Sequence, residues 1–127
     1  MIVLDTGALV ALARGERRMW VRVAHAVAND VPVVVPAGAL ARGWRGGGPR
    51  QARLARALAD CETASFDRQA KAAGELCGRT GTEDVVDASV ALVAADPTAR
   101  ALYTSDPGDL RHLLESVGRH RPAIIAI

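Results

Sequence analysis

The chain has 127 residues, half of them hydrophobic, and a formal net charge of +2. This length predicts one domain, residues 1–127, with enough apolar side chains for a core. The small net charge does not by itself predict a strongly polyanionic partner, and two cysteines are too few for a disulfide framework or a zinc cluster.

No part of the sequence predicts a membrane segment or a leader peptide. The opening apolar run is short and ends at Asp5, unlike a secretory signal. No stretch approaches the roughly 20 apolar residues that a spanning helix needs. We therefore expect a soluble cytoplasmic protein that does not enter a membrane.

Short apolar runs alternate with stretches of helical periodicity along the chain. The expected strands are residues 1–4, 31–35, 61–66, 100–104 and 123–127. The expected helices are residues 8–13, 16–28, 36–45, 50–58, 67–77, 83–95 and 107–117. Repeated strand–helix units of this kind predict a three-layer α/β/α fold around a mainly parallel sheet of four to five strands.

Asp5 directly follows the first expected strand and precedes Thr6 and Gly7. An aspartate is unfavourable within a buried strand but well placed just past its carboxyl end. In open parallel α/β sheets, ligands bind at that edge. Asp5 is therefore the first candidate site residue.

Asp84 and Asp87 have the spacing i, i+3 at the start of an expected helix, which predicts that both carboxylates lie on one helix face. Helix-dipole preference alone could explain Asp84. It does not explain Asp87, which lies among apolar residues. Such a like-charged pair is costly unless a cation or water compensates it.

Asp106 and Asp109 follow the fourth expected strand. Helix capping could explain both, because Asp106 suits the N-cap, Pro107 the first helical position and Asp109 the third. The alternative is that three strand or helix ends bring acids to one rim. Magnesium and manganese favour such all-oxygen sites.

A basic stretch surrounds Trp44. It could follow a phosphate backbone, but a solvated helix face explains most of its members equally well. Its residues are Arg42, Arg45, Arg50, Arg53 and Arg56.

Three segments together resemble the PIN-domain family, and most closely its VapC-type toxins from bacterial toxin–antitoxin modules. They are residues 1–12, 84–91 and 104–110, and their order and spacing match that family over the whole chain. The resemblance implies a PIN-like fold and a magnesium- or manganese-dependent endoribonuclease.

The resemblance also assigns roles to residues. It implies that Asp5, Asp84 and Asp106 are catalytic metal ligands and that Asp87 and Asp109 support them. Thr6 and Ser105 would position water or a ligand carboxylate. The implied partners are an RNA substrate, a small cognate antitoxin and a second copy of the chain in a homodimer.

The sequence departs from the family pattern at one position. The family has an acid on the helix after the second strand, where this chain most closely aligns Arg42. That arginine could repel a second metal or, with Arg45, bind the substrate phosphate. One alternative is therefore a degenerate PIN domain that binds RNA or a partner without cleavage. Another, a receiver-type phosphoacceptor, needs a lysine near the last strand, whereas the only lysine is Lys71.

Overall fold

The structure, a computed structural model, describes all 127 residues and contains five strands and seven helices. The strands are β1 (Ile2–Leu4), β2 (Val33–Pro36), β3 (Glu62–Ala64), β4 (Ala101–Thr104) and β5 (Ala123–Ala126). The helices are α1 (Thr6–Ala13), α2 (Arg17–Ala28), α3 (Ala37–Gly43), α4 (Gly48–Leu58), α5 (Ala70–Thr80), α6 (Val85–Ala94) and α7 (Pro107–Val117).

All five strands are parallel and form one sheet in the order β3-β2-β1-β4-β5. The chain therefore builds outward from β1 to one edge and then returns to the other side of β1. The carboxyl ends of β1 and β4 flank the point where this order reverses. Ligands of doubly wound sheets bind at such a point.

Alternating residues of the central strands form two separate cores. Ile2 and Leu4 face one core, whereas Val3 faces the other, as the two-residue period of a strand requires. Because both faces are covered, these strands consist almost entirely of apolar residues. This explains the short continuous apolar runs in the sequence.

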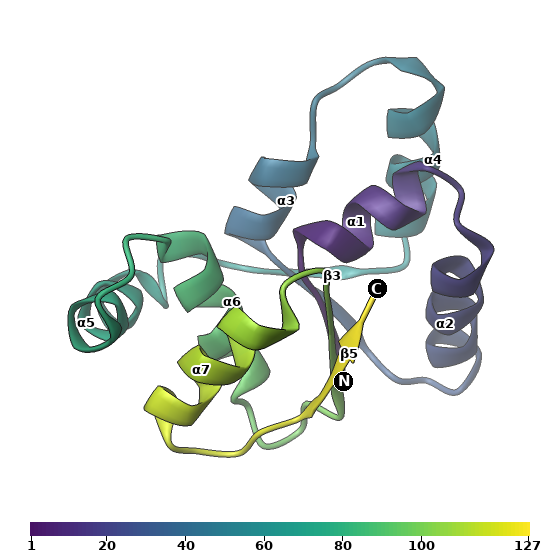
Figure 1. Ribbon diagram of the computed structural model, residues 1–127. Coiled ribbons are helices and arrows are strands. Elements are labelled where there is room, and N and C mark those ends of the chain that lie inside the picture. Colours follow the sequence, from purple (N-terminus) through teal and green to yellow (C-terminus); the bar gives the residue numbers. More distant parts are fainter.

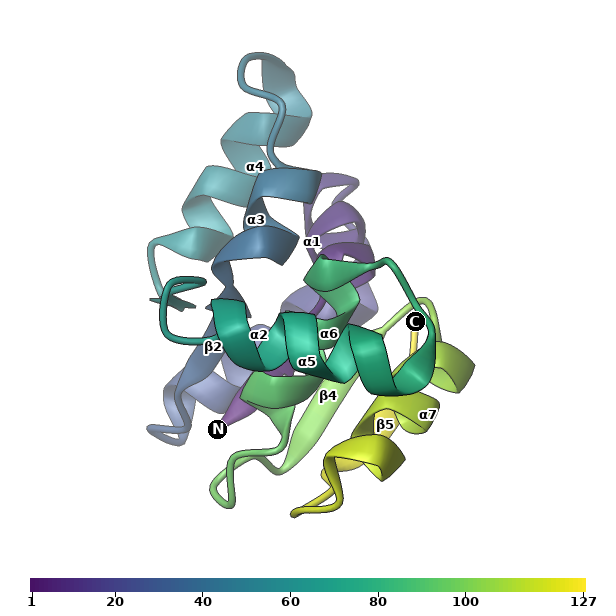
Figure 2. The same cartoon turned by 90° about the vertical axis from the view of Figure 1, so that its left-hand side faces the viewer.

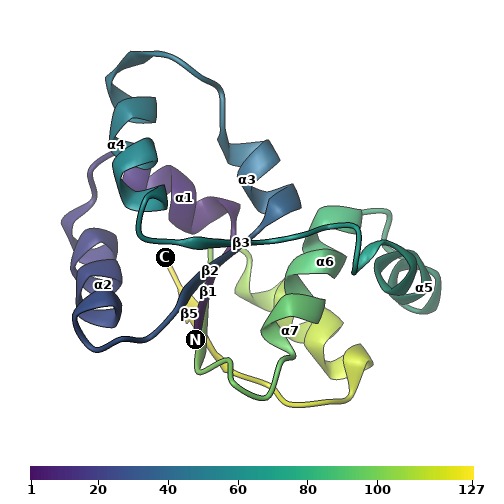
Figure 3. The ribbon, with the colours of Figure 1, turned by 180° about the vertical axis from the view of Figure 1, so that it is seen from behind.

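The helices form one layer on each face of the sheet (Figure 1). Residues of α1, α2 and α4 contribute to one core, and residues of α5, α6 and α7 contribute to the other. Figure 2 faces the second layer, and Figure 3 shows both layers from behind. The expected three-layer α/β/α architecture is confirmed.

Two helices differ in their boundaries from the sequence prediction, and the first of these differences affects the site. Helix α6 begins at Val85, so Asp84 is its N-cap rather than a helical residue stacked below Asp87. Helix α5 begins at Ala70 after Gln69, and it continues to Thr80. The expected helix over residues 67–77 was therefore placed three residues too early at both ends; Gly81, with a φ of 76°, ends α5.

None of the helices combines the length and the apolar character that crossing a membrane would require.

Candidate functional site

A cleft of about 540 Å³ lies at the carboxyl end of the sheet, where the strand order reverses. It lies between the segments that follow β1 and β4, and α3 and α6 also contribute to its wall. The polar residues that line it are Asp5, Thr6, Arg14, Glu16, Arg42, Asp87, Ser105 and Asp106. The topology thus brings acids from three distant parts of the chain to one cavity.

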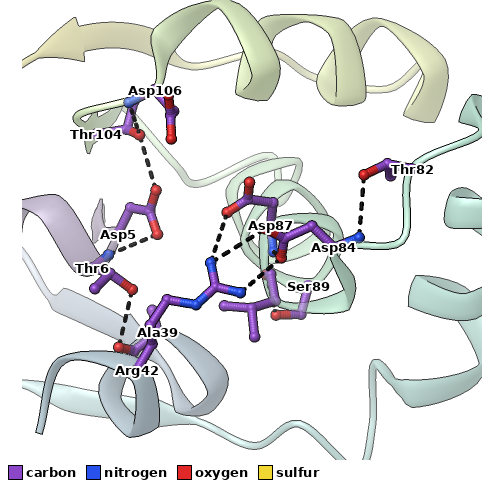
Figure 4. A network of polar contacts seen from close by, with 11 residues as sticks. Asp5, Thr6, Ala39, Arg42, Thr82, Asp84, Asp87, Ser89, Thr104 and Asp106 are labelled. Carbon is purple, nitrogen blue, oxygen red and sulfur yellow. Dashed lines mark hydrogen bonds and ion pairs between the residues drawn. The ribbon is translucent and has the colours of Figure 1, made fainter.

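Asp5 is held rigidly at the base of this cleft. Its residue surface is only 5% exposed. One carboxylate oxygen accepts a hydrogen bond of 2.7 Å from the Thr6 N–H, and the other accepts one of 2.9 Å from the Thr104 hydroxyl. Asp5 therefore caps α1 and has a fixed orientation in the cleft (Figure 4).

Thr104 is a site residue that the sequence analysis missed. It is the fully buried last residue of β4. Its hydroxyl donates to Asp5 and accepts a hydrogen bond of 2.9 Å from the Asp106 N–H. It thereby links the two strand ends that carry acids. A polar residue at the end of an otherwise apolar strand was the available signal.

Asp106 and Asp109 do not use their side chains as helix caps. Asp106 occupies the N-cap position of α7, but its carboxylate makes no capping hydrogen bond. The capping explanation is therefore wrong for Asp106. Instead, one carboxylate oxygen each from Asp87, Asp106 and Asp109 lies within 4.8 Å of the others.

Asp84 forms an ion pair with Arg42. The Arg42 guanidinium binds both of its oxygens, at 3.0 Å and 3.3 Å, and lies 3.6 Å from an oxygen of Asp87. The side chains of Arg42 and Asp84 are 43% and 34% exposed, respectively. Asp84 also caps α6 by accepting from the Asp87 N–H at 3.0 Å. Figure 4 shows Arg42 reaching from α3 to both acids.

The pKa values of these acids separate according to their surroundings. Burial raises the pKa of Asp5. Burial and the nearby carboxylates of Asp84 and Asp5 raise the pKa of Asp87 to about 7. For Asp84, burial acts to raise the pKa, but hydrogen bonds from Arg42 and the Asp87 N–H outweigh it, so the pKa is lowered. In the metal-free protein, the ionised forms of Asp5 and Asp87 are therefore disfavoured, and a bound cation would relieve this.

The cluster of Asp87, Asp106 and Asp109 has the chemistry of a cation site and could hold a metal ion. Its donors are all carboxylate oxygens, which hard divalent cations prefer. Oxygens opposite each other on Mg²⁺ lie about 4.2 Å apart, twice the ~2.1 Å bond length. The separations of up to 4.8 Å in the cluster are slightly wider than this. The donor set therefore fits a divalent cation after small side-chain adjustments.

The other predicted site residues have mixed placements. Ser105 lines the cleft. Thr6 lines it too, but its hydroxyl donates to the Ala39 carbonyl at 3.1 Å and so ties α1 to α3. Arg45 does not line the cleft, because its guanidinium donates to the carbonyls of Ala41 and Trp44. Lys71 is exposed on α5, away from the last strand.

Gly7 is needed for the close approach of the two acid-bearing segments. A Cβ atom there would lie 2.5 Å from the Ser105 hydroxyl oxygen and 2.9 Å from the Ser105 backbone nitrogen. Such contacts would force α1 away from the β4–α7 connection. The local sequence does not predict this contact, because Gly7 and Ser105 are far apart in the chain.

We expect Gly7→Ala to lower the free energy of unfolding by about 1–3 kcal/mol, as overpacking typically does, and to weaken divalent-cation binding. Gly108→Ala in α7 is the matched control, because a Cβ atom there meets nothing within 4 Å. It should retain wild-type stability or gain up to about 1 kcal/mol. Urea denaturation and Mn²⁺ titration would measure both effects, and equal behaviour of the two variants would contradict the close-approach role.

The sequence matches no protein-family model and no curated protein.

Proposed function

We propose that this protein is a metal-dependent endoribonuclease of the PIN-domain type, acting as the toxin of a toxin–antitoxin pair. The observation that carries the proposal is the meeting of Asp5, Asp87 and Asp106 in one cleft at the switch point of the sheet. Two of these acids, Asp5 and Asp87, are buried, and fold stability alone gives no reason to bury two carboxylates at one site.

The proposed cofactor is Mg²⁺ or Mn²⁺, held by Asp87, Asp106 and Asp109 with Asp5 beside them. The all-carboxylate donor set supports a hard cation over zinc or copper, which favour histidine and cysteine. When bound, such an ion lowers the pKa of a water molecule and stabilises charge on the phosphate. The resemblance-based set of Asp5, Asp84 and Asp106 shares Asp106 with this cluster.

The side chains have distinct proposed roles. Asp5 is oriented by Thr104 and the Thr6 N–H, so it would present a fixed carboxylate to the cation or its water. Ser105 lines the same cleft and would orient a water molecule or a phosphate oxygen. Thr6 would act by positioning α1 against α3, because its hydroxyl already donates to the Ala39 carbonyl.

Arg42 would bind a non-bridging oxygen of the scissile phosphate. It lines the cleft, and its side chain is 43% exposed despite the contact with Asp84. Guanidinium groups are well suited to phosphate oxygens. Asp84 would then position this arginine rather than ligate the ion.

The proposed partners rest on the resemblance. They are an RNA substrate, a small antitoxin that covers the cleft and a second copy of the chain. A short open reading frame directly upstream of this gene would support the antitoxin pairing.

One alternative has its own support. Arg42 stands where the family has an acid and neutralises Asp84 directly, so the protein could bind RNA or a partner without cleaving it. Cleavage by the wild-type protein would exclude this alternative.

Cleavage of RNA by purified protein is the direct test. We expect product in Mg²⁺ or Mn²⁺, none in EDTA, and recovery when the cation is restored. Mn²⁺ titration followed by electron paramagnetic resonance should detect binding without reference to activity. Absence of both cation binding and cleavage would refute the proposal.

A further inference from the structure

Charge is strongly segregated along this chain, although the net value is only +2. Residues 14–58 contain nine arginines and two acids, whereas the remaining residues contain seven basic and twelve acidic side chains. The first group comprises α2, β2, α3 and α4 with their connections. In Figure 1, α2 and α4 lie on one side of the sheet. One side of the molecule is therefore basic next to a cleft that is acidic.

An open depression of about 550 Å³ lies within this basic region, between the start of α2 and α4. Its lining residues are Gly15, Arg17, Trp20, Arg53 and Arg56. None of the three arginines forms an ion pair, since all the ion pairs of the protein involve Arg42 or Arg121. Three uncompensated guanidinium groups and one indole thus surround a single hollow.

Two of the lining side chains are fixed to the last turn of α1. Arg53 donates to the Ala13 carbonyl at 3.0 Å, and its aliphatic stem lies near Gly15. Trp20 donates from its indole N–H to the Leu12 carbonyl at 3.0 Å. These bonds preorganise the depression. Arg17 and Arg56 make no side-chain hydrogen bond or ion pair and are exposed, so both are free to bind a ligand.

The depression is next to the acidic cleft. Arg14 and Glu16 line the cleft, while Gly15 and Arg17, which alternate with them in sequence, line the depression. The α1–α2 connection is therefore a wall shared by both cavities. A flexible chain leaving the cleft would cross Arg14 and reach Arg17.

We propose that this depression is a second binding site for single-stranded RNA. It would bind the nucleotides next to those that occupy the cleft. Arg17 and Arg56 would bind its phosphates, and Trp20 would contact a base. Guanidinium groups combined with an aromatic side chain are the usual means of holding single strands without sequence preference. The choice of RNA as ligand rests on the proposed function, but the site requires no catalysis.

The test is RNA binding by the double variant Arg17→Gln/Arg56→Gln in EDTA. Arg53 stays unchanged because it also binds α1. Fluorescence anisotropy with a fluorescein-labelled 12-nucleotide single-stranded RNA should give at least about tenfold weaker binding at 0.1 M salt. The log–log slope of affinity against salt should become less steep by about 1.4, at about 0.7 per lost phosphate contact.

The matched control is Arg79→Gln/Arg119→Gln, which removes the same charge from exposed, unpaired arginines elsewhere. It should bind RNA within about twofold of the wild type. Because Trp20 and Trp44 are the only tryptophans, Trp44→Phe leaves Trp20 as the single indole reporter. RNA should quench its fluorescence.

Wild-type affinity in the double variant, an equal loss in the control, or unquenched Trp20 would each overturn the proposal. Tighter binding of a labelled polyglutamate peptide than of RNA would also overturn it. All measurements use EDTA, so RNA binding through Arg17 and Arg56 without any cleavage would leave this proposal standing while the nuclease proposal fails.

Discussion

Asp5→Asn should reduce divalent-cation-dependent RNA cleavage by about 100-fold or more, the usual cost of removing a preorganised charged group from an active site. Asparagine keeps the size of the side chain and can still accept from the Thr6 N–H. The substitution therefore removes a negative charge from the base of the cleft with little change in shape. Cleavage rates and Mn²⁺ affinity would measure the effect.

The same substitution should affect stability in a different way. Burial raises the pKa of Asp5, so in the metal-free wild type its ionisation opposes folding as the pH rises above the ordinary carboxyl value of 3.8. Asparagine removes this penalty but leaves the Thr104 hydroxyl without its acceptor, at a cost of about 1 kcal/mol. The stability of Asp5→Asn relative to wild type should therefore improve with pH from about 4 upward.

Asp30→Asn is the matched control for this experiment. Asp30 is exposed and precedes β2, at the amino end of the strands and so opposite the cleft. Its φ of 56° is one that asparagine tolerates well. It should cut RNA and bind Mn²⁺ like the wild type. Undiminished cleavage by folded Asp5→Asn would exclude Asp5 from the site.

Arg42→Glu should have opposite effects in the absence and presence of a divalent cation. Without the cation, loss of the partly exposed contact with Asp84 and the added acid should lower the free energy of unfolding by about 1 kcal/mol. This corresponds to a few degrees in the melting temperature. With Mn²⁺ at about 100 times its Kd, binding adds about 2.7 kcal/mol, and the melting temperature should exceed the metal-free wild-type value.

The underlying change is in Mn²⁺ affinity, which we expect to rise at least about tenfold because a guanidinium is replaced by a carboxylate beside Asp87. Arg42→Gln separates the two effects, since it removes the guanidinium charge without adding an acid. Its affinity for Mn²⁺ should be intermediate. Unchanged Mn²⁺ affinity in Arg42→Glu would show that Arg42 does not compete with a cation. If Arg42→Glu cleaves RNA and the wild type does not, the result would favour the alternative in which the natural chain binds RNA without cleaving it.

The fold was predictable because its signals are local. The central strands are short apolar runs, β-branched in residues 33–35, and residues 107–117 show helical spacing that begins at a proline. The placement of Asp5 and Asp106 after strands was also readable from neighbouring residues. Helix ends were less predictable, as at Thr80, because competing caps differ by only small energies.

By itself, the sequence determined the α/β class, the five strands and the acids that end two of them, because these depend on local periodicity and turn chemistry. Only the tertiary structure decided how those acids are used. Thr104 binds Asp5 across 99 positions, and Arg42 binds Asp84 across 42. Such contacts depend on which strand ends become neighbours in the sheet. For the same reason, the small net charge concealed a basic side beside an acidic cleft until the helices were placed.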